Sequence, residues 1–250
     1  MTTVTRLNIH IEKSAEELAQ FAAKQLVEIL SRAIKERGSG SLVLSGGKTP
    51  RRVYQILGSK PLSDRLEWNC VHCFFGDERM VPPDHPDSNY GMARRELFER
   101  VPIPAENVHR IQGELTAEQA ALEYANELRS IYKGRIPRFD CVLLGIGEDG
   151  HTASLFPGTD ALSENEKSTV ALFVPRLKAW RATLTFRVIN NAREIIFLAE
   201  GEKKASIVRK VIESAMPSMN FPATMVRPHD GVLRWMLDSE VSSFIRLKRR

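Results

Sequence analysis

The sequence lacks the long apolar stretches that mark membrane proteins and the leader that marks secreted ones. None of its apolar runs approaches the roughly 18 residues of a membrane span. The opening MTTVTRLNIH also lacks the basic-then-apolar order of a secretion signal. We therefore expect a cytoplasmic protein that does not insert into a membrane.

Cysteine and histidine are too few and too scattered to predict a metal or redox centre. The three cysteines, Cys70, Cys73 and Cys141, lie in apolar runs, which is typical of buried reduced thiols. On a strand, the odd spacing of Cys70 and Cys73 would point them to opposite faces, which disfavours a disulfide or a shared metal. The six histidines include no pair at ligand spacing, so we expect no metal and no cofactor.

Aromatic residues make up only 7% of the chain, and no aromatic RNA-binding signature or zinc-ligand set is present. The formal charge of +5 permits an anionic partner, and the tail RLKRR at 246–250 is basic. We interpret the tail as a solvated terminus. A phosphorylated small molecule explains the charge as well as nucleic acid does, so we expect no nucleic-acid partner.

The pattern of apolar residues predicts a single α/β domain over residues 1–250. Length and a hydrophobic content of 42% suit one sizeable core. Residues 14–36 have helical periodicity, with Ser14 as N-cap, Glu17 as its partner and Gly38 at the end. The alternation that follows predicts a mostly parallel, Rossmann-like open sheet with helices on both faces and room for a small antiparallel addition.

The remaining elements are predicted from apolar runs and their flanking turn residues. Strands are expected at 41–45, 69–75, 107–111, 139–144, 169–174, 181–186, 194–199 and 232–237, and further helices from 49, from 89, at 116–132 and at 202–215. In such sheets ligands bind outside the carboxyl ends of the strands. Three of the expected strand ends carry residues that could bind a ligand or catalyse a reaction.

The first strand end is LVLSGGKTP, residues 42–50. Its Ser45-Gly46-Gly47 turn exposes backbone N–H groups, with Thr49 expected as helix cap and Pro50 at the first helical position, an arrangement that suits an anion. The trio Gly47-Lys48-Thr49 mimics a nucleotide-phosphate loop. That motif needs another glycine five residues before Gly47, however, and Leu42 stands there. A phosphate site is predicted here, and a plain strand-turn-helix junction is the alternative.

The second strand end is FFGDERMVPPDHPDSNYG, residues 74–91. Asp77, Glu78 and Arg79 follow an aromatic strand end and are expected at the same rim of the sheet. A solvated charge cluster is the alternative. The polar, Pro-rich loop 79–88 follows them.

The third strand end, GIGEDGHTASLFPG at 145–158, contains a literal G-x-G-x-x-G. A dinucleotide fingerprint needs a long helix after the glycines and an acidic residue about twenty positions on. Pro157 allows at most two helical turns, and the next apolar run ends in Val174-Pro175-Arg176. The loop instead offers Asp149 and His151, and an ordinary turn is the alternative.

Four segments together resemble the 6-phosphogluconolactonase family, within the group that includes glucosamine-6-phosphate deaminases. They are LSGGKTP, GDERMVPPDHPDSNYGMARRELF, LLGIGEDGHTASLFPG and GEKKA, and the likeness covers roughly residues 8–240. The resemblance implies that the protein hydrolyses 6-phosphogluconolactone, so that the substrate is a sugar phosphate. It also implies the site residues Asp77, Arg79, Asp149 and His151, and it adds Arg181 and Lys204 for the phosphate.

The resemblance also separates the two activities of the group. Deaminases are similar through DGH but continue as F-N-E-P, with a glutamate that assists ring opening. Here Ser154-Leu155-Phe156-Pro157 occupies that stretch, and Phe156 cannot relay a proton. A deaminase or isomerase, a catalytically silent sugar-phosphate-binding module and an NAD-dependent oxidoreductase remain the alternatives, in that order.

Lactone hydrolysis requires an activated water and donors for the oxyanion. We expect neutral His151 to be the general base, with Asp149 or Asp77 orienting the imidazole or the sugar hydroxyls. Arg79 is expected to neutralise charge near the lactone or the phosphate. The turn 45–47, Arg181 and Lys204 are expected to bind the phosphate, with Lys203 as the neighbouring candidate and a solvated side chain as the alternative for it. A monomer or a weak homo-oligomer is expected.

Overall fold

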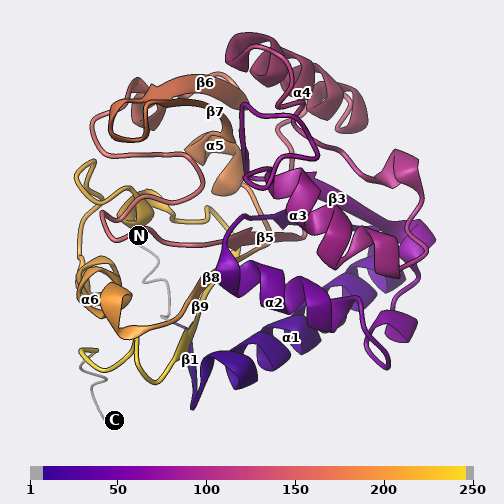
Figure 1. Cartoon of the computed structure of the whole chain (residues 1–250), viewed down its shortest axis with the longest axis horizontal. Coiled ribbons are helices and arrows are strands. Elements are labelled where there is room, and N and C mark those ends of the chain that lie inside the picture. The colour runs from indigo at the N-terminus through magenta and orange to yellow at the C-terminus, as the bar shows by residue number, and fades with distance from the viewer. Residues whose placement is uncertain (1–7, 246–250) are drawn as a thin grey trace.

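The computed structural model describes residues 8–245, which form two β-sheets and the helices around them (Figure 1). The basic tail at 246–250 lies outside the described residues. The strands are β1 (Asn8–Glu12), β2 (Gly40–Leu44), β3 (Val71–Phe75), β4 (Asp77–Arg79), β5 (Cys141–Leu144), β6 (Thr169–Val174), β7 (Ala179–Leu184), β8 (Glu194–Ala199) and β9 (Val232–Asp238). The α-helices are α1 (Ala15–Arg37), α2 (Lys48–Leu57), α3 (Asn89–Glu96), α4 (Ala117–Ile131), α5 (Phe186–Ile189) and α6 (Ala205–Glu213).

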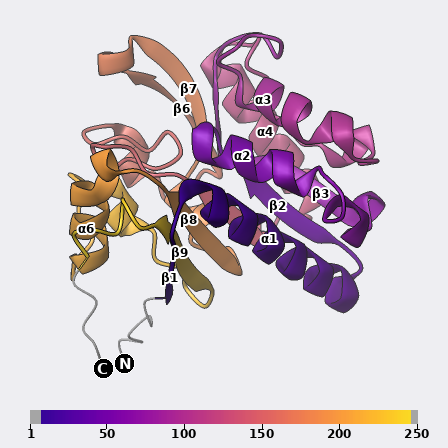
Figure 2. The ribbon, with the colours of Figure 1, turned by 60° about the horizontal axis from the view of Figure 1, so that its bottom comes forward.

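The larger sheet is parallel and has the strand order β1-β9-β8-β5-β2-β3. The connections through α1 and α2 step across it in one direction, and those from β3 to β5, β8 and β9 step back. Because such crossovers are right-handed, the two sets cover opposite faces. In Figure 2, α1 and α2 lie side by side in front of β2 and β3. The predicted mostly parallel open sheet is confirmed.

The smaller sheet is antiparallel, with the order β4-β7-β6. It contains the predicted strand at 169–174 and a strand that begins at Ala179, two residues before the expected 181–186. The glycine between β3 and β4 joins the two sheets: Gly76 N donates to Leu44 O at 2.9 Å, and Gly76 O accepts from Leu184 N at 2.8 Å. The small antiparallel addition is therefore real, and it begins at the residues singled out after β3.

Local signals predicted the first helix correctly. Ser14 Oγ accepts a hydrogen bond from Glu17 N at 3.2 Å, and Gly38 ends α1 in the left-handed conformation with φ 78°. The predicted strand at 107–111 is wrong, because Val108 forms only an isolated bridge to Cys73 after a 3-10 turn at Ala105–Asn107. Strand β1 had no counterpart in the prediction.

The cysteines are free, as expected, but Cys70 is only partly buried, and it lies in a 3-10 turn before β3 and not on the strand with Cys73. Burial raises the pKa of the Cys73 thiol to about 12, so this thiol stays protonated. The structure also brings two histidines together that lie 37 residues apart, with His72 Nδ1 at 3.1 Å from His109 Nε2. Within residues 8–245 no group of three or more His, Cys, Asp or Glu side chains could hold a metal ion.

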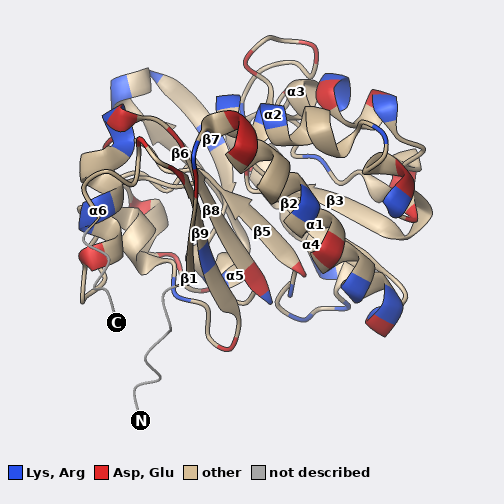
Figure 3. Cartoon of the chain, turned by 90° about the horizontal axis from the view of Figure 1, so that it is seen from below, with Lys and Arg blue, Asp and Glu red and all other residues tan. Residues whose placement is uncertain are grey.

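The core fills the space between the parallel sheet and its helices. Strands β2, β3 and β5 contain no charged residue, as expected for strands that are covered on both faces. Figure 3 shows Lys, Arg, Asp and Glu mainly on the helices, the loops and the strand ends. Among the described residues, no helix is both long and apolar enough to cross a membrane.

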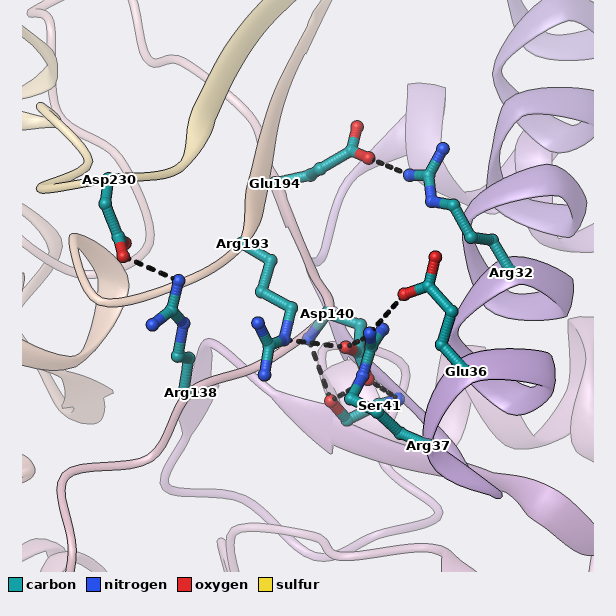
Figure 4. Close-up of polar contacts among 9 residues, drawn as sticks. All are labelled: Arg32, Glu36, Arg37, Ser41, Arg138, Asp140, Arg193, Glu194 and Asp230. Carbon is teal, nitrogen blue, oxygen red and sulfur yellow. Dashed lines mark hydrogen bonds and ion pairs between the residues drawn. The ribbon is translucent and has the colours of Figure 1, made fainter.

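A buried carboxylate ties the amino ends of the strands together (Figure 4). Asp140, which is 7% exposed, accepts hydrogen bonds from Ser41 N and Ser41 Oγ, both at 2.9 Å, and from Arg37 Nη2 at 2.8 Å. Arg193 Nε lies 3.2 Å from the same carboxylate. One side chain before β5 thus connects the end of α1, the start of β2 and the start of β8.

We predict that Asp140→Asn lowers the free energy of unfolding by roughly 2–3 kcal/mol, because an amide leaves buried donors without an acceptor. The matched control is Asp230→Asn, which removes one partly exposed ion pair, with Arg138 Nη2 at 2.8 Å. It should cost less than about 1 kcal/mol. Urea denaturation of the three proteins measures both values. Equal losses for the two variants would contradict the structural role of Asp140.

Candidate active site

A cavity of about 570 Å³ opens at the carboxyl ends of the parallel strands, where the three predicted strand ends meet. This volume suits a small ligand. The predicted site residues that line it are Ser45, Gly46, Gly47, Lys48, Thr49, Asp77, Arg79, His151 and Lys204. The other two predicted residues, Asp149 and Arg181, contact or adjoin residues of this lining.

His151 is held by Asp149. Its Nδ1 lies 2.5 Å from Asp149 Oδ1, and its backbone N donates to the same oxygen at 3.2 Å. A carboxylate can only accept, so Nδ1 carries a proton, and in the neutral ring Nε2 carries the lone pair. Burial acts to raise the pKa of Asp149, but the hydrogen bonds with His151 and the charge of Arg176 together hold it below its usual value. The pair has the geometry of a base with its orienting carboxylate.

The glycines of the loop make room for this imidazole. A Cβ on Gly147 would lie 2.0 Å from His151 Nδ1, and Gly150 adopts φ +81°, which favours glycine. The ring stacks on Phe156, with centroids 4.1 Å apart. Residues 151–159 form no helix after the loop, so the dinucleotide fingerprint lacks its essential element. The glycines present the histidine.

Arg176 belongs to the site and was missed from sequence. It lies in the 3-10 turn Pro175–Leu177 between β6 and β7 and lines the cavity. Its Nη2 is 2.8 Å from Asp149 Oδ2, and its guanidinium lies over the Phe156 ring at 4.9 Å. Only its position directly after a strand marked it in the sequence, because its partner is 27 positions away.

Asp77 is fixed by two neighbours that carried no sequence signal. Ser154 Oγ donates to Asp77 Oδ2 at 2.6 Å, and Asn89 Nδ2 donates to Asp77 O at 2.8 Å and to Oδ1 at 3.2 Å. Asp77 is 7% exposed but lines the cavity. No hydrogen bond or ion pair among residues 8–245 joins it to His151, whose carboxylate partner is Asp149.

Two arginines stand directly opposite each other at the cavity edge. Arg79 on β4 pairs in register with Arg181 on β7, and like charges in this position are destabilising. Burial, followed by the charge of Arg79, lowers the pKa of Arg181. Arg79 lines the cavity and donates to Asp87 O, whereas Arg181 does not line it. A bound anion would relieve the repulsion between the two guanidinium groups.

The turn at 45–49 has the geometry of an anion site, with one correction to the prediction. Helix α2 begins at Lys48 with Gly47 as N-cap, so Thr49 is not the cap and Pro50 is not the first helical residue. Gly47 adopts φ 112°, a conformation that favours glycine, and it provides no side-chain acceptor for the first N–H groups. Ser45 Oγ is also buried without a hydrogen-bond partner in the described residues.

Lys204 reaches the cavity from the start of α6. It ends the 3-10 turn Glu202–Lys204, and no ion pair of the described residues includes it. Burial lowers the pKa of the Lys204 ammonium, and the carboxylates of Glu200 and Glu148 act in the opposite direction. A half-buried ammonium at a helix N-terminus is unfavourable in isolation and is stabilised by an anion.

A larger cavity, of about 850 Å³, lies at the amino ends of the strands. Its charged lining includes Asp140, Arg37 and Arg193, which satisfy one another as described above. The cavity at the carboxyl ends differs, because it holds His151 paired with Asp149, next to the N-terminus of α2. We therefore assign the chemistry to the carboxyl ends.

Comparison with known proteins gives relatives over most of the chain. The chain is 39% identical over 223 residues to a 6-phosphogluconolactonase of Synechocystis sp., covering 87% of this chain and 89% of that protein. It is 37% identical over 247 residues to the human 6-phosphogluconolactonase, covering 95% and 93% of the two chains.

Solved structures show the same fold. The 6-phosphogluconolactonase from Trypanosoma cruzi aligns with a TM-score of 0.86 at 32% identity, over 97% of this chain and 98% of that one. A monomeric glucosamine-6-phosphate deaminase shares the fold, with a TM-score of 0.80 at 23% identity over 95% and 99% of the chains.

A family model described as glucosamine-6-phosphate isomerases/6-phosphogluconolactonase matches residues 13–235. This range contains all four segments on which the resemblance was based. Together with relatives above 30% identity over most of both chains, the match settles the family. The chain belongs to the family of glucosamine-6-phosphate isomerases and 6-phosphogluconolactonases.

Proposed function

We propose that this protein hydrolyses 6-phospho-D-glucono-1,5-lactone to 6-phospho-D-gluconate, the second step of the oxidative pentose phosphate pathway. The observation that carries the proposal is the His151–Asp149 pair in a cavity that also holds unpartnered cationic and N–H groups. The names of the relatives in Synechocystis and human agree with it. The chain's own residues supply both a base for water and a cradle for a phosphate.

His151 is the general base in this proposal. Its Nε2 takes a proton from water as the water oxygen attacks C1 of the lactone, and C1 becomes tetrahedral with a negative oxygen. The C1–O5 bond then breaks, and the imidazolium returns the proton to the leaving ring oxygen. The Asp149 carboxylate stabilises the imidazolium between these two steps, because it lies 2.5 Å from Nδ1.

The cationic groups divide between the phosphate and the lactone. Lys204 and the N–H groups of the turn 45–47 bind the phosphate, and Arg181 adds its positive charge from beside Arg79; the phosphate in turn stabilises the desolvated ammonium and guanidinium. Arg79 lines the cavity and neutralises charge near the lactone or the phosphate. Asp77 accepts from a sugar hydroxyl. The reaction as written requires no metal and no cofactor.

The alternative within the family is a glucosamine-6-phosphate deaminase, and the residue beside His151 disfavours that activity. The ring beside the imidazole is Phe156, which cannot transfer a proton during ring opening. Release of ammonia from glucosamine 6-phosphate would identify that activity. A silent binding module would bind 6-phosphogluconate and leave the lactone to decay at its spontaneous rate.

A cytoplasmic location, a single domain and a monomeric or weakly associated state remain part of this proposal. Relatives in rice carry the name chloroplastic. Fractionation of cells and the mass of the protein in solution would test these points.

We predict that His151→Ala retains folding and binding of 6-phosphogluconate while turnover falls by about a hundredfold or more. The variant loses the proton acceptor and keeps the phosphate contacts. A pH-stat assay on freshly made lactone, corrected for spontaneous hydrolysis, measures turnover, and calorimetry measures binding. Near-parental turnover in the folded variant would end the general-base assignment.

We predict that turnover of the parent rises with pH on the acid side, because only neutral imidazole accepts a proton from water. The pKa of Asp149 is lowered, so its carboxylate keeps its charge until the pH falls below the usual range of an aspartate. Asp149→Asn should reduce turnover by about tenfold or more, because an amide does not stabilise the imidazolium. Parental turnover in folded Asp149→Asn would contradict the pairing.

We predict that Lys204→Ala and Arg181→Ala each raise KM for the phosphorylated lactone by roughly tenfold to a hundredfold, because each removes a charged contact to the phosphate. The matched control is Lys203→Ala, since this neighbour is exposed and does not line the cavity. The parent should also hydrolyse unphosphorylated gluconolactone poorly. Similar use of both lactones by the parent would refute the phosphate site.

A further inference from the structure

Glu78 lies between two residues of the cavity but does not line it. Successive side chains of a strand point to opposite faces, so Asp77 and Arg79 face the cavity and Glu78 points away from it. Glu78 is 1% exposed, and no ion pair of the described residues includes it. A buried carboxylate without a cation is costly unless hydrogen bonds compensate it.

Four donors compensate this charge. Oε1 accepts from Arg79 N and Asn89 N, both at 2.8 Å, and Oε2 accepts from Tyr90 N at 2.8 Å and Ser88 Oγ at 3.0 Å. Ser88 Oγ in turn accepts from Gly91 N at 2.9 Å. Together the two side chains satisfy the first three N–H groups of α3, so Glu78 fixes the start of this helix against β4.

The helix start fixed in this way carries a side chain into the cavity. Asn89, the first residue of α3, lines the cavity and donates from Nδ2 to both Asp77 O and Asp77 Oδ1. Its Oδ1 fills the space beside Gly46, where a Cβ would lie 2.0 Å away. Strand β4, helix α3 and the turn after β2 therefore meet at Asn89.

We propose that Glu78 is a positioning residue for the reaction: it holds Asn89, and through Asn89 the Asp77 carboxylate, in the place that the sugar requires. The proposal rests on the proposed lactone hydrolysis and assigns to Glu78 no contact with substrate. A carboxylate is needed because both oxygens accept two bonds each. A glutamine has one acceptor oxygen, so its NH₂ group faces two of the four donors.

The first test is Glu78→Gln, measured as kcat/KM on fresh lactone with folding checked by circular dichroism. We expect a loss of roughly tenfold to a hundredfold, the range that misplaced site residues produce. The matched control is Glu194→Gln, which alters another buried glutamate. Glu194 is 6% exposed and is paired with Arg32 and Arg234 at the amino end of β8. This substitution should lower stability and leave kcat/KM within about twofold of the parent.

A double-mutant cycle separates positioning from a general loss of stability. If Glu78 acts through Asn89, the losses in kcat/KM from Glu78→Gln and Asn89→Ala do not multiply, and the double variant resembles the worse single variant. The losses from Glu78→Gln and Lys204→Ala do multiply. Multiplying losses with Asn89→Ala, or parental kcat/KM in folded Glu78→Gln, would overturn the proposal.

Two further measurements keep the proposal testable. If Glu78→Gln does not fold, Glu78→Asp enters the same cycle, because its shorter side chain keeps the charge and loses the reach to α3. Parental kcat/KM in Asn89→Ala would by itself overturn the link. If the parent does not hydrolyse the lactone, the proposed function fails, and the same cycle read as the Kd for 6-phosphogluconate still decides whether Glu78 positions the site.

Discussion

The site depends on the two hydrogen bonds of Gly76. Its N–H continues the parallel ladder from β2, and its carbonyl begins the antiparallel ladder with β7. This one residue turns the chain from the main sheet into the smaller one, so that β4 passes in front of the carboxyl ends of the strands. Asp77 and Arg79 thereby reach the cavity, and β7 brings Arg181 opposite Arg79. Without this junction the three strand ends would share an edge but not a cavity.

The groups around the cavity are arranged for a charge that the chain itself does not supply. Arg79 and Arg181 repel each other across the strands, and the pKa values of Arg181 and Lys204 are both lowered by burial. Asp149 is already engaged by His151 and Arg176. A phosphate would stabilise these groups together, and part of its binding free energy would then come from relief of unfavourable interactions in the free protein.

Contacts that are local in the chain could be predicted, and contacts across it could not. Ser14, Gly38 and the glycines beside His151 act within a few residues, so their patterns are visible in sequence. Arg176 meets Asp149 across 27 positions. The acceptor role of Glu78 depends on how α3 folds back on β4, and D-E-R otherwise resembles a solvated cluster. The family resemblance supplied the substrate, which composition alone left open.

The Asp140 cluster and the cavity lie at opposite ends of the strands, so mutations at the two places have different consequences. The interactions that join α1, β2 and β8 (Figure 4) lie at the amino ends of the strands, and His151 and the rest of the cavity lie at the carboxyl ends. Substitutions in the loops at the carboxyl ends therefore leave these interactions intact. Directed evolution of the cavity in this chain can use this separation by leaving the residues around Asp140 untouched.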